Sequence, residues 1–424
     1  MPLSKERTIF VPGNNRNNYQ LDNHPLYSVD LSFKGEDTQH TTHAIHPYVA
    51  AINPPLVAAL IDSFVPPNGT ILDPFCGGGG VLVESMLKGK NAEGGDINPL
   101  AVHISNAKTR YIPKRIIDKY YSFIMNRIGT QEGPNIPVIP SAVKYWFKDY
   151  MLSPLVQLKN SLARLSENID INDDIYKDDI VNLFKVILSA TVRDVMLTYR
   201  GEVRLRKLQG SDYDRFNPDV IETYKKRAIL TMERVSQLPN NVTSMSSILD
   251  VKNMPFRNNQ FTTIICSPPY GDDKNGVGYF QFSKKMLYFL GYDDTNIKQY
   301  KNLFLGELKD NKIVPPSNNL RESLNNVLNR NETHYKEGVA FYNDYYYALI
   351  EMCRVVQHRI IIVIGNRVLS RTHFDNPAIT IELLDSLGIV LEHHFERTLP
   401  KKRIANLGGD GGGGNTEHIL VFRK

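Results

Sequence analysis

Apolar runs and helical patterns alternate along most of the chain, with a long helical interruption in the middle. Short apolar runs predict strands at residues 70–72, 91–95, 261–266, 359–365, 389–395 and 417–423, with one more just before Asp250. Apolar positions at helical spacing predict helices near 52–64, 100–110, 178–199, 219–238, 342–353 and 377–387. Because strands alternate with helices, we expect an α/β protein with a mostly parallel sheet.

The stretch from Thr70 to Pro99 has the plan of a nucleotide-binding βαβ unit: a strand, a glycine turn, a helix and a second strand that ends in an acid. The glycines at 77–80 lack Cβ, so they can take positive φ and let a ligand lie against bare backbone. Asp96 ends the second strand, where it can accept hydrogen bonds from ribose hydroxyls. Asp73 precedes the glycines, and its carboxylate would repel a phosphate but suit a cationic sulfonium amino acid. The stretch therefore indicates S-adenosylmethionine in preference to NAD, with a purely structural turn as the lesser alternative.

The strand predicted at 261–266 runs into Ser267-Pro268-Pro269-Tyr270. Proline fixes φ, removes an N–H donor and forces the preceding residue into an extended conformation. Two consecutive prolines therefore make a stiff platform that presents carbonyl acceptors at the end of a strand. A base turned out of a duplex could stack on Tyr270 while its exocyclic amine donates to Ser267 and a backbone carbonyl. A structural Pro-Pro turn is the alternative, and the glycine stretch weighs against it.

Taken together, Asp73-Pro74-Phe75-Cys76-Gly77 and Ser267-Pro268-Pro269-Tyr270 resemble the motif pair of the amino-methylating DNA methyltransferases. The serine before the prolines is similar to the cytosine-N4 branch, whereas adenine-N6 members more often carry Asp or Asn there. The resemblance covers residues 43–110, 240–290 and 340–424. It implies a class I methyltransferase-like fold, with a seven-stranded, mostly parallel sheet, helices on both faces and, in this chain, helical insertions. It also implies S-adenosylmethionine as cofactor and double-stranded DNA as substrate.

The resemblance assigns site residues by matching position. The catalytic residues would be Ser267, Pro268, Pro269 and Tyr270. The cofactor would be bound by Pro47, Asp73, Pro74, Phe75, Cys76, Gly77, Gly79, Asp96, Ile97 and Asp250. Asp250 matches the family's adenine-contacting acid, and Pro47 lies in a His-Pro-Tyr segment similar to the one before the first motif. The family's usual Gly-Ser-Gly is replaced here by consecutive glycines, which leaves the roles of Gly78 and Gly80 open.

The pattern also predicts a division of the chain. We expect an N-terminal arm at 1–40, a catalytic domain at 41–110 and 241–424, a helical insertion at 111–240 that contacts DNA and reads the target, and a second insertion at 271–340 that contacts DNA or forms a lid. The helical insertion contains a basic stretch at 200–207, for which a solvated charged face is an equal alternative. Tyr145, Trp146 and Phe147 are expected in the core, and His43 and His46 are expected to be structural.

Charge and composition bear on the class of ligand and on the cellular compartment. The 424-residue chain has a formal net charge of +5 and an isoelectric point near 8.8, which is compatible with nucleic-acid binding. Cys76, Cys266 and Cys353 show no metal-ligand spacing, so we expect no metal, and a reducing cytosol is the simplest compartment. No apolar run approaches ~18 residues and the first residues do not resemble a signal peptide, so a cytoplasmic protein without a membrane segment is predicted.

These observations predict a site-specific DNA methyltransferase that acts on the N4 amine of a flipped-out cytosine in a restriction-modification or defence system. A cognate restriction nuclease is a candidate partner, and the oligomeric state is open. Adenine-N6 methylation of DNA is one alternative, RNA base methylation is another, and a DNA-binding subunit of a defence assembly with little activity is a third. Carbon-5 methylation is rejected because it needs a cysteine nucleophile, typically after proline, and the chain has no Pro-Cys dipeptide.

Overall fold

The computed structural model describes residues 24–49, 51–128, 139–199, 205–271, 279–308, 312–399 and 412–424. Its strands are β1 (Ile71–Asp73), β2 (Ala92–Asp96), β3 (Ser244–Ile248), β4 (Phe261–Cys266), β5 (Val356–Leu369), β6 (Thr372–Phe374), β7 (Val390–Thr398) and β8 (Gly412–Arg423). Its α-helices are α1 (Pro54–Phe64), α2 (Gly80–Leu87), α3 (Pro99–Thr109), α4 (Lys114–Arg127), α5 (Ser141–Lys144), α6 (Asp149–Ala163), α7 (Lys177–Val195), α8 (Gly210–Arg215), α9 (Val220–Val235), α10 (Tyr279–Phe289), α11 (Asp294–Lys301), α12 (Asn318–Leu328), α13 (Glu332–Val355) and α14 (Asn376–Asp385). Short 3-10 helices are η1 (Pro25–Ser28), η2 (Thr41–Ile45), η3 (Ser166–Asn168) and η4 (Ile171–Tyr176).

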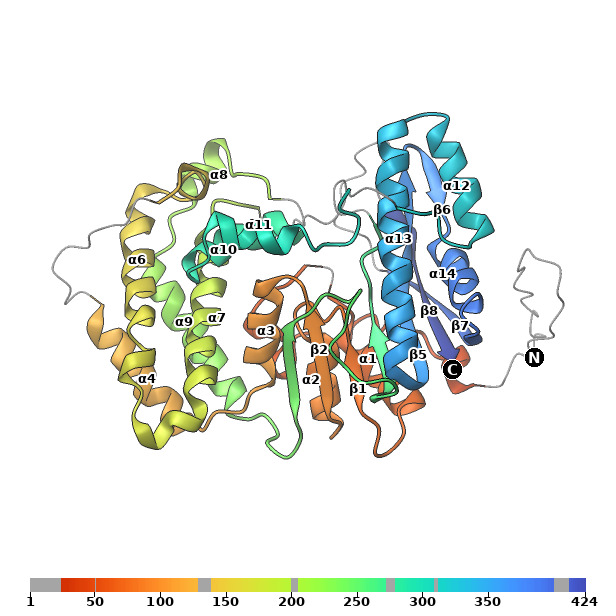
Figure 1. Ribbon diagram of the computed structural model, residues 1–424. Helices are drawn as coiled ribbons and strands as arrows, with labels where there is room; N and C mark the ends of the chain where they lie inside the picture. Colours follow the sequence, from red (N-terminus) through yellow and green to blue (C-terminus); the bar gives the residue numbers. More distant parts are fainter. Residues whose placement is uncertain are drawn as a thin grey trace, which may run out of the picture.

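The strands form one mixed sheet in the order β3-β2-β1-β4-β5-β8-β7, with β6 paired to β5 as an eighth strand. β1 to β5 pair in parallel, whereas β6, β7 and β8 join antiparallel. The prediction of a mostly parallel sheet in a class I methyltransferase-like fold is confirmed (Figure 1). The prediction of seven strands omitted β6, which returns along β5 through a two-residue turn at Ser370 and Arg371, both at positive φ. Such turns are usually signalled by Asn-Gly or Asp-Gly, so Ser-Arg gives no sequence signal.

The two faces of the sheet follow the two-residue period of a strand. Leu72, Ile264 and Ile362 lie on one face, in an apolar cluster with side chains of α13 and α14. The residues between them in the strands belong to the opposite face, where they pack with α1 and α2. Both faces are therefore buried, as the apolar run at 359–365 predicted.

A helical lobe stands beside the β3 edge of the sheet, formed by α4, α6, α7 and α9 (Figure 1). α10 packs against α7 and α3, so the start of the region predicted as a second insertion joins this lobe, whereas α12 packs against α13. Trp146 and Phe147 are buried in the lobe as expected, but Tyr145 is 56% exposed, which corrects its assignment to the core. The Lys207 ammonium lies over the Tyr145 ring, 3.7 Å from its centroid. Within the described ranges, no helix is long and apolar enough to cross a lipid bilayer.

The predicted N-terminal arm is only partly described, because residues 1–23 lie outside the described ranges. From His24 onward the segment packs on the body of the protein, which corrects the expectation of an extended arm for this part. Leu26 and Leu31 are buried, and the His24 ring stacks on Phe64 with centroids 4.7 Å apart.

The order of the parallel strands reverses between β1 and β4. From β1 the chain proceeds outward to β2 and β3, whereas β4 is followed on its other side by β5. Ligands of open α/β sheets bind outside the carboxyl ends of the strands at such a switch point. The residues that follow β1 and β4 are therefore expected to form a ligand-binding site.

Candidate active site

A cavity lies at the switch point and encloses about 950 Å³ of space not occupied by protein, part of it open to solvent. Its walls come from the segment before α1, the turns that follow β1, β2, β3 and β4, and the connection between α11 and α12. The lining residues are Tyr48, Val49, Ala51, Ile52, Asp73, Pro74, Phe75, Cys76, Gly77, Gly78, Gly80, Asp96, Ile97, Asn98, Leu249, Asp250, Val251, Ser267, Pro269, Leu303, Phe304 and Leu305.

The turn after β1 is held together by backbone hydrogen bonds to two acids. Asp73 Oδ1 accepts from the Phe75 N–H at 3.1 Å, and Asp96 Oδ2 accepts from the Gly77 N–H at 3.0 Å. Asp96 Oδ1 accepts from the Asn98 N–H at 2.8 Å. Each carboxylate oxygen has a second lone pair, so both acids can still accept from a ligand. Burial raises the pKa of Asp73 to about 8 and that of Asp96 to about 6.

Gly79 has a structural role in the turn. It caps the start of α2 at φ 79°, and it does not line the cavity. A Cβ at this position would lie 2.7 Å from Ser105 Cβ and 2.9 Å from Ser105 Cα. The residue therefore allows α2 to approach α3 closely, and its part in cofactor binding stays a prediction. Gly78 and Gly80, whose roles were left open, do line the cavity.

The segment before α1 reaches over the glycine turn. Tyr48 lines the cavity, and a Cβ on Gly78 would lie 2.8 Å from Tyr48 Cβ. The Asn98 amide donates to the Tyr48 hydroxyl at 3.1 Å and to Ser283 Oγ at 2.7 Å. Pro47 is exposed and lies outside the lining, so its assignment to the cofactor site stays a prediction. Asn98 was missed, although an Asn-Pro pair at a helix start was visible in the sequence.

The histidines before this segment are buried, as a structural role requires. His46 is fully buried, with Nε2 3.0 Å from Ser189 Oγ and Nδ1 2.7 Å from the Pro47 carbonyl. Burial lowers the pKa of His46 to about 3, so this ring is neutral at physiological pH. His43 contacts Glu84 of α2 through Nε2, at 2.7 Å.

Asp250 lies where the third strand leads into the cavity, as predicted. Its Oδ1 also accepts from the Lys252 N–H at 3.0 Å, so the residue both forms a turn and faces the cavity. Leu303, Phe304 and Leu305 add an apolar wall from the second insertion. Their contribution could not be seen in the sequence, because nothing local marks them.

Ser267 and Pro269 line the same cavity as the glycine turn, whereas Pro268 and Tyr270 do not. Pro268 is buried behind the wall. The Tyr270 ring packs over Gly365, where a Cβ would lie 2.8 Å from Tyr270 Cε2. Asp73 and the Ser-Pro-Pro-Tyr segment share one cleft, because β1 pairs with β4 and Asp73, Ser267 and Pro269 all line the same cavity.

Tyr270 is fixed by residues far along the chain. Its hydroxyl donates to Glu417 Oε1 at 2.9 Å and lies 3.5 Å from Ser267 Oγ. Glu417 Oε2 accepts from Arg397 Nε at 2.8 Å and Nη2 at 2.7 Å across the β7–β8 pair. Burial, reinforced by the Glu417 carboxylate, raises the pKa of Tyr270 well above its usual value, so the phenol stays protonated and donates.

A second support holds the backbone of the same segment. The Asn376 amide donates to the Tyr270 carbonyl at 3.2 Å and to the Gly365 carbonyl at 2.9 Å. Asn376 is in turn held by the Tyr342 hydroxyl, which donates to its Oδ1 at 2.6 Å. Glu417, Arg397 and Asn376 were not predicted, and no local pattern in the sequence marks them.

The basic residues of the helical lobe are largely engaged within the protein. Arg227 pairs with Asp194 at 2.5 Å, and Lys225 pairs with Glu222 at 2.6 Å. The first part of the predicted basic stretch, residues 200–204, lies outside the described ranges. A DNA contact by this stretch therefore stays a prediction.

Two comparisons with known proteins bear on this site. The UPF0020 family, an RMKL-like methyltransferase domain, matches residues 43–121. The type II methyltransferase M.MvaI of Kocuria varians is 29% identical over 410 residues, which cover 88% of this chain and 87% of that protein. The type II methyltransferase M.MjaII of Methanocaldococcus jannaschii is 26% identical over 164 residues, or 37% of this chain and 29% of that protein.

Both comparisons support a methyltransferase. In such an enzyme the donor of the methyl group is S-adenosylmethionine, and the matched residues 43–121 contain the segment before α1, the glycine turn and Asp96. The similarity to M.MvaI extends well beyond this part, because it covers most of both chains.

Proposed function

We propose that this protein is a site-specific DNA methyltransferase that transfers a methyl group from S-adenosylmethionine to the N4 amine of a flipped-out cytosine, within a restriction-modification or defence system. The observation that carries the proposal is the shared cavity, which brings Asp73 and the glycine turn to one wall and Ser267 and Pro269 to the other. The similarity to two type II methyltransferases supports DNA as the substrate.

The glycine-turn wall suits the cofactor. Asp73 and Asp96 make this wall acidic once ionised, which favours a sulfonium and an ammonium group and disfavours a phosphate. Asp96 would also accept from the ribose hydroxyls, and Asp250 from the adenine amine. Gly77 and Gly78 would let the ligand approach the backbone, with Tyr48 above them. Bound there, S-adenosylmethionine supplies an electrophilic methyl group.

The wall formed by Ser267 and Pro269 suits the target base. Ser267 Oγ would accept from an N–H bond of the amine, which orients its nitrogen lone pair toward the methyl donor. The Pro268 carbonyl, the second acceptor expected from the sequence, would need the segment to shift, because Pro268 does not line the cavity. The Tyr270 ring packs over Gly365 outside the cavity, so Tyr270 would support the base indirectly, by holding this segment in place through Glu417. The chain then acts by positioning and by stabilising charge, without a covalent enzyme intermediate.

The cysteines support amine methylation over carbon-5 methylation. Cys76 lines the cavity, but burial and the nearby Asp96 and Asp73 raise the pKa of its thiol. Burial also raises the pKa of Cys266. Neither thiol is therefore activated as the nucleophile that carbon-5 chemistry needs.

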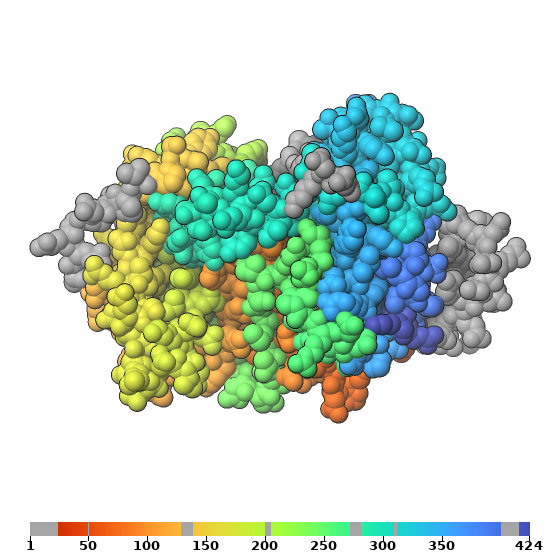
Figure 2. Space-filling view, in the orientation of Figure 1, coloured from red at the N-terminus to blue at the C-terminus, as the bar shows by residue number. Residues whose placement is uncertain are grey.

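DNA would approach the edge of the sheet at which β1 and β4 end. The helical lobe lies on one side of the molecule and α12 and α13 on the other (Figure 2). A duplex bound between these two parts would place a flipped base near the carboxyl ends of β1 and β4. On this proposal the helical insertion at 111–240 reads the target, and the catalytic domain comprises 41–110 and 241–424 with the insertion at 271–340.

A labelled-methyl assay on duplex DNA, followed by mass spectrometry of the nucleosides, tests the proposal. We expect N4-methylcytosine; N6-methyladenine would establish the adenine alternative, and label only in RNA would establish the RNA alternative. Ser267→Ala should abolish transfer and leave cofactor affinity, measured by calorimetry, within about threefold. The exposed Ser386→Ala is the matched control and should retain activity. No transfer by the unmodified protein to any nucleic acid, with DNA binding intact, would favour the DNA-binding subunit.

A further inference from the structure

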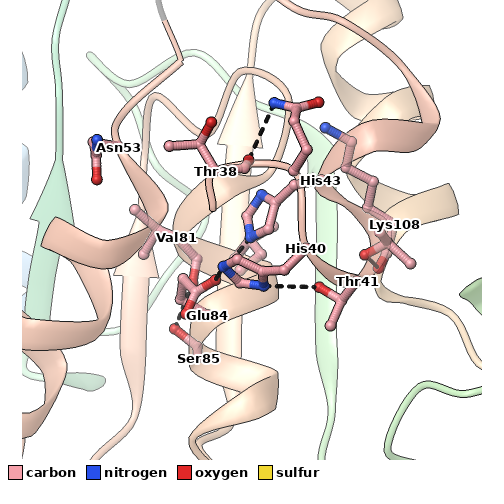
Figure 3. A network of polar contacts seen from close by, with 12 residues as sticks. Thr38, His40, Thr41, His43, Asn53, Val81, Glu84, Ser85 and Lys108 are labelled. Atoms are coloured by element: carbon pink, nitrogen blue, oxygen red, sulfur yellow. Dashed lines mark hydrogen bonds and ion pairs between the residues drawn. The ribbon is translucent and has the colours of Figure 1, made fainter. Parts of the chain in front are cut away.

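Outside the cavity, two histidines and a glutamate converge behind the glycine turn (Figure 3). His43 on η2 places its Nε2 2.7 Å from Glu84 Oε1, and His40 places its Nε2 3.4 Å from the same oxygen. The three ligand atoms all lie within 4.8 Å of one another. The side chains of His43 and Glu84 are 6% and 4% exposed, whereas that of His40 is 32% exposed. The cluster is thus buried at His43 and Glu84 and accessible to solvent at His40.

The arrangement has the geometry and ligand types of a metal site. Zinc binds imidazole nitrogen and carboxylate oxygen at about 2.0–2.2 Å with tetrahedral geometry, which places neighbouring ligand atoms about 3.3–3.5 Å apart. The His40–Glu84 distance already matches this spacing, and the His43–Glu84 distance needs to open by less than 1 Å. Two histidines and one glutamate are a known zinc ligand set that leaves a fourth position for water. The exposed side of His40 is where that water would enter.

Lys108, which is drawn beside the cluster in Figure 3, does not form an ion pair with Glu84. Lys108 is buried, and its ammonium points away from Glu84 in Figure 3. Its Nζ lies against the glycine turn instead, 3.6 Å from the position that a Cβ on Gly78 would take. Glu84 thus has two imidazoles, and no lysine or arginine in an ion pair, among its contacts in the described part of the chain.

We propose that His40, His43 and Glu84 form a binding site for Zn²⁺ or a similar divalent transition metal. Bound metal would join η2 to α2. The chain runs from η2 into Tyr48 and Ile52, which line the cavity, and α2 begins at the glycine turn. The metal would therefore brace the cofactor wall from behind without touching the cavity. Sequence analysis predicted no metal, because Glu84 lies 41 residues from His43 and the ligands show no recognisable spacing.

Metal content after loading tests this site. Full-length protein is stripped with a chelator, dialysed against Zn²⁺ and then against buffer, and its zinc is measured by mass spectrometry. We expect the unmodified protein to retain about one zinc more per chain than His40→Ala, and Glu84→Gln to show the same loss. Cobalt loading should give the visible absorption of a tetrahedral Co²⁺ site in the unmodified protein but not in His40→Ala or Glu84→Gln. Circular dichroism checks that each variant is folded, and His40→Ala is the safer of the two because its side chain is partly exposed.

The chain offers a matched control in a second His-Glu group. His394, Glu396 and His418 lie on β7 and β8 with a similar ligand spacing but with Glu396 exposed. His394→Ala should leave the zinc and cobalt signals of the first cluster unchanged. Equal zinc in the unmodified protein and in His40→Ala would overturn the proposal, as would a loss caused by His394→Ala alone. No retained zinc in the unmodified protein would show that the cluster is only a His-Glu hydrogen bond.

Discussion

The two walls of the cavity differ in where their support comes from. The glycine-turn wall is held by contacts within one βαβ unit, through Asp73, Gly77 and Asp96. The Ser-Pro-Pro-Tyr wall depends on partners about a hundred or more residues away, through Glu417 and Asn376. The glycine-turn wall is therefore held by contacts between residues close in sequence. The Ser-Pro-Pro-Tyr wall is complete only when β8 and α14 have packed onto β5. Damage to the first should affect folding or cofactor binding, and damage to the second should affect turnover.

Among these substitutions, Gly79→Ala in the glycine-turn wall should have the largest effect, a loss of folding stability. The new Cβ would meet the Ser105 backbone at 2.9 Å, and the residue would be held at positive φ. Overpacking and backbone strain together should lower the free energy of unfolding by about 3 kcal/mol, measured by urea denaturation. Gly89→Ala is the control, because it has positive φ but no atom within 4 Å, and it should lose only about 1 kcal/mol. Equal losses of unfolding free energy in the two variants would show that α3 can shift away from the new Cβ and that the turn is not close-packed against it.

Tyr270→Phe should lower turnover without changing cofactor affinity, which would distinguish the Ser-Pro-Pro-Tyr wall from the glycine-turn wall. It removes the hydrogen bond to Glu417 and keeps the aromatic ring and the Glu417–Arg397 pair. With the ring less firmly placed, kcat should fall about tenfold, while calorimetry shows cofactor affinity unchanged. Tyr346→Phe, whose hydroxyl makes only an exposed 3.5 Å contact with Ser386, should behave like the unmodified protein. A parallel loss of cofactor affinity in Tyr270→Phe would mean that the two walls are not independent.

The pH dependence of cofactor binding should come from the glycine-turn wall. Because burial raises the pKa of Asp73 to about 8, its ionised fraction grows about fivefold between pH 7 and pH 8. Only the ionised carboxylate attracts a cationic ligand, so affinity should increase as pH rises through this window. Asp73→Asn should show a weaker affinity and a flatter profile in the same titration. An unchanged slope in that variant would assign the pH dependence to another group.

The smallest effect is expected at Pro47, which the structure places outside the cavity. Pro47→Ala should leave the dissociation constant for the cofactor within about twofold, because only the backbone near an exposed side chain changes. Asp250→Ala, in contrast, should weaken binding about tenfold by removing an acceptor that faces the cavity. A stronger effect at Pro47 than at Asp250 would support the sequence-based assignment of Pro47 to cofactor binding.

Much of the architecture could be predicted because its signals are local. The seven strands other than β6, the glycine turn and the Pro-Pro platform each depend on residues within a short window, where backbone preferences act. The strand order, which only the structure gives, then brings Asp73 and Ser267 together at the switch point where parallel sheets bind ligands. β6 escaped prediction because a Ser-Arg turn has no recognisable signature.

The amino-acid sequence by itself determined the α/β fold, the acidic glycine turn and the stiff platform after β4. Only the tertiary structure decided that Gly79 packs on Ser105, that Glu417 and Arg397 hold Tyr270, and that Glu84 meets His43. The physical reason is range: a backbone preference is felt within a few residues, whereas a contact between distant side chains depends on how whole helices and strands pack together.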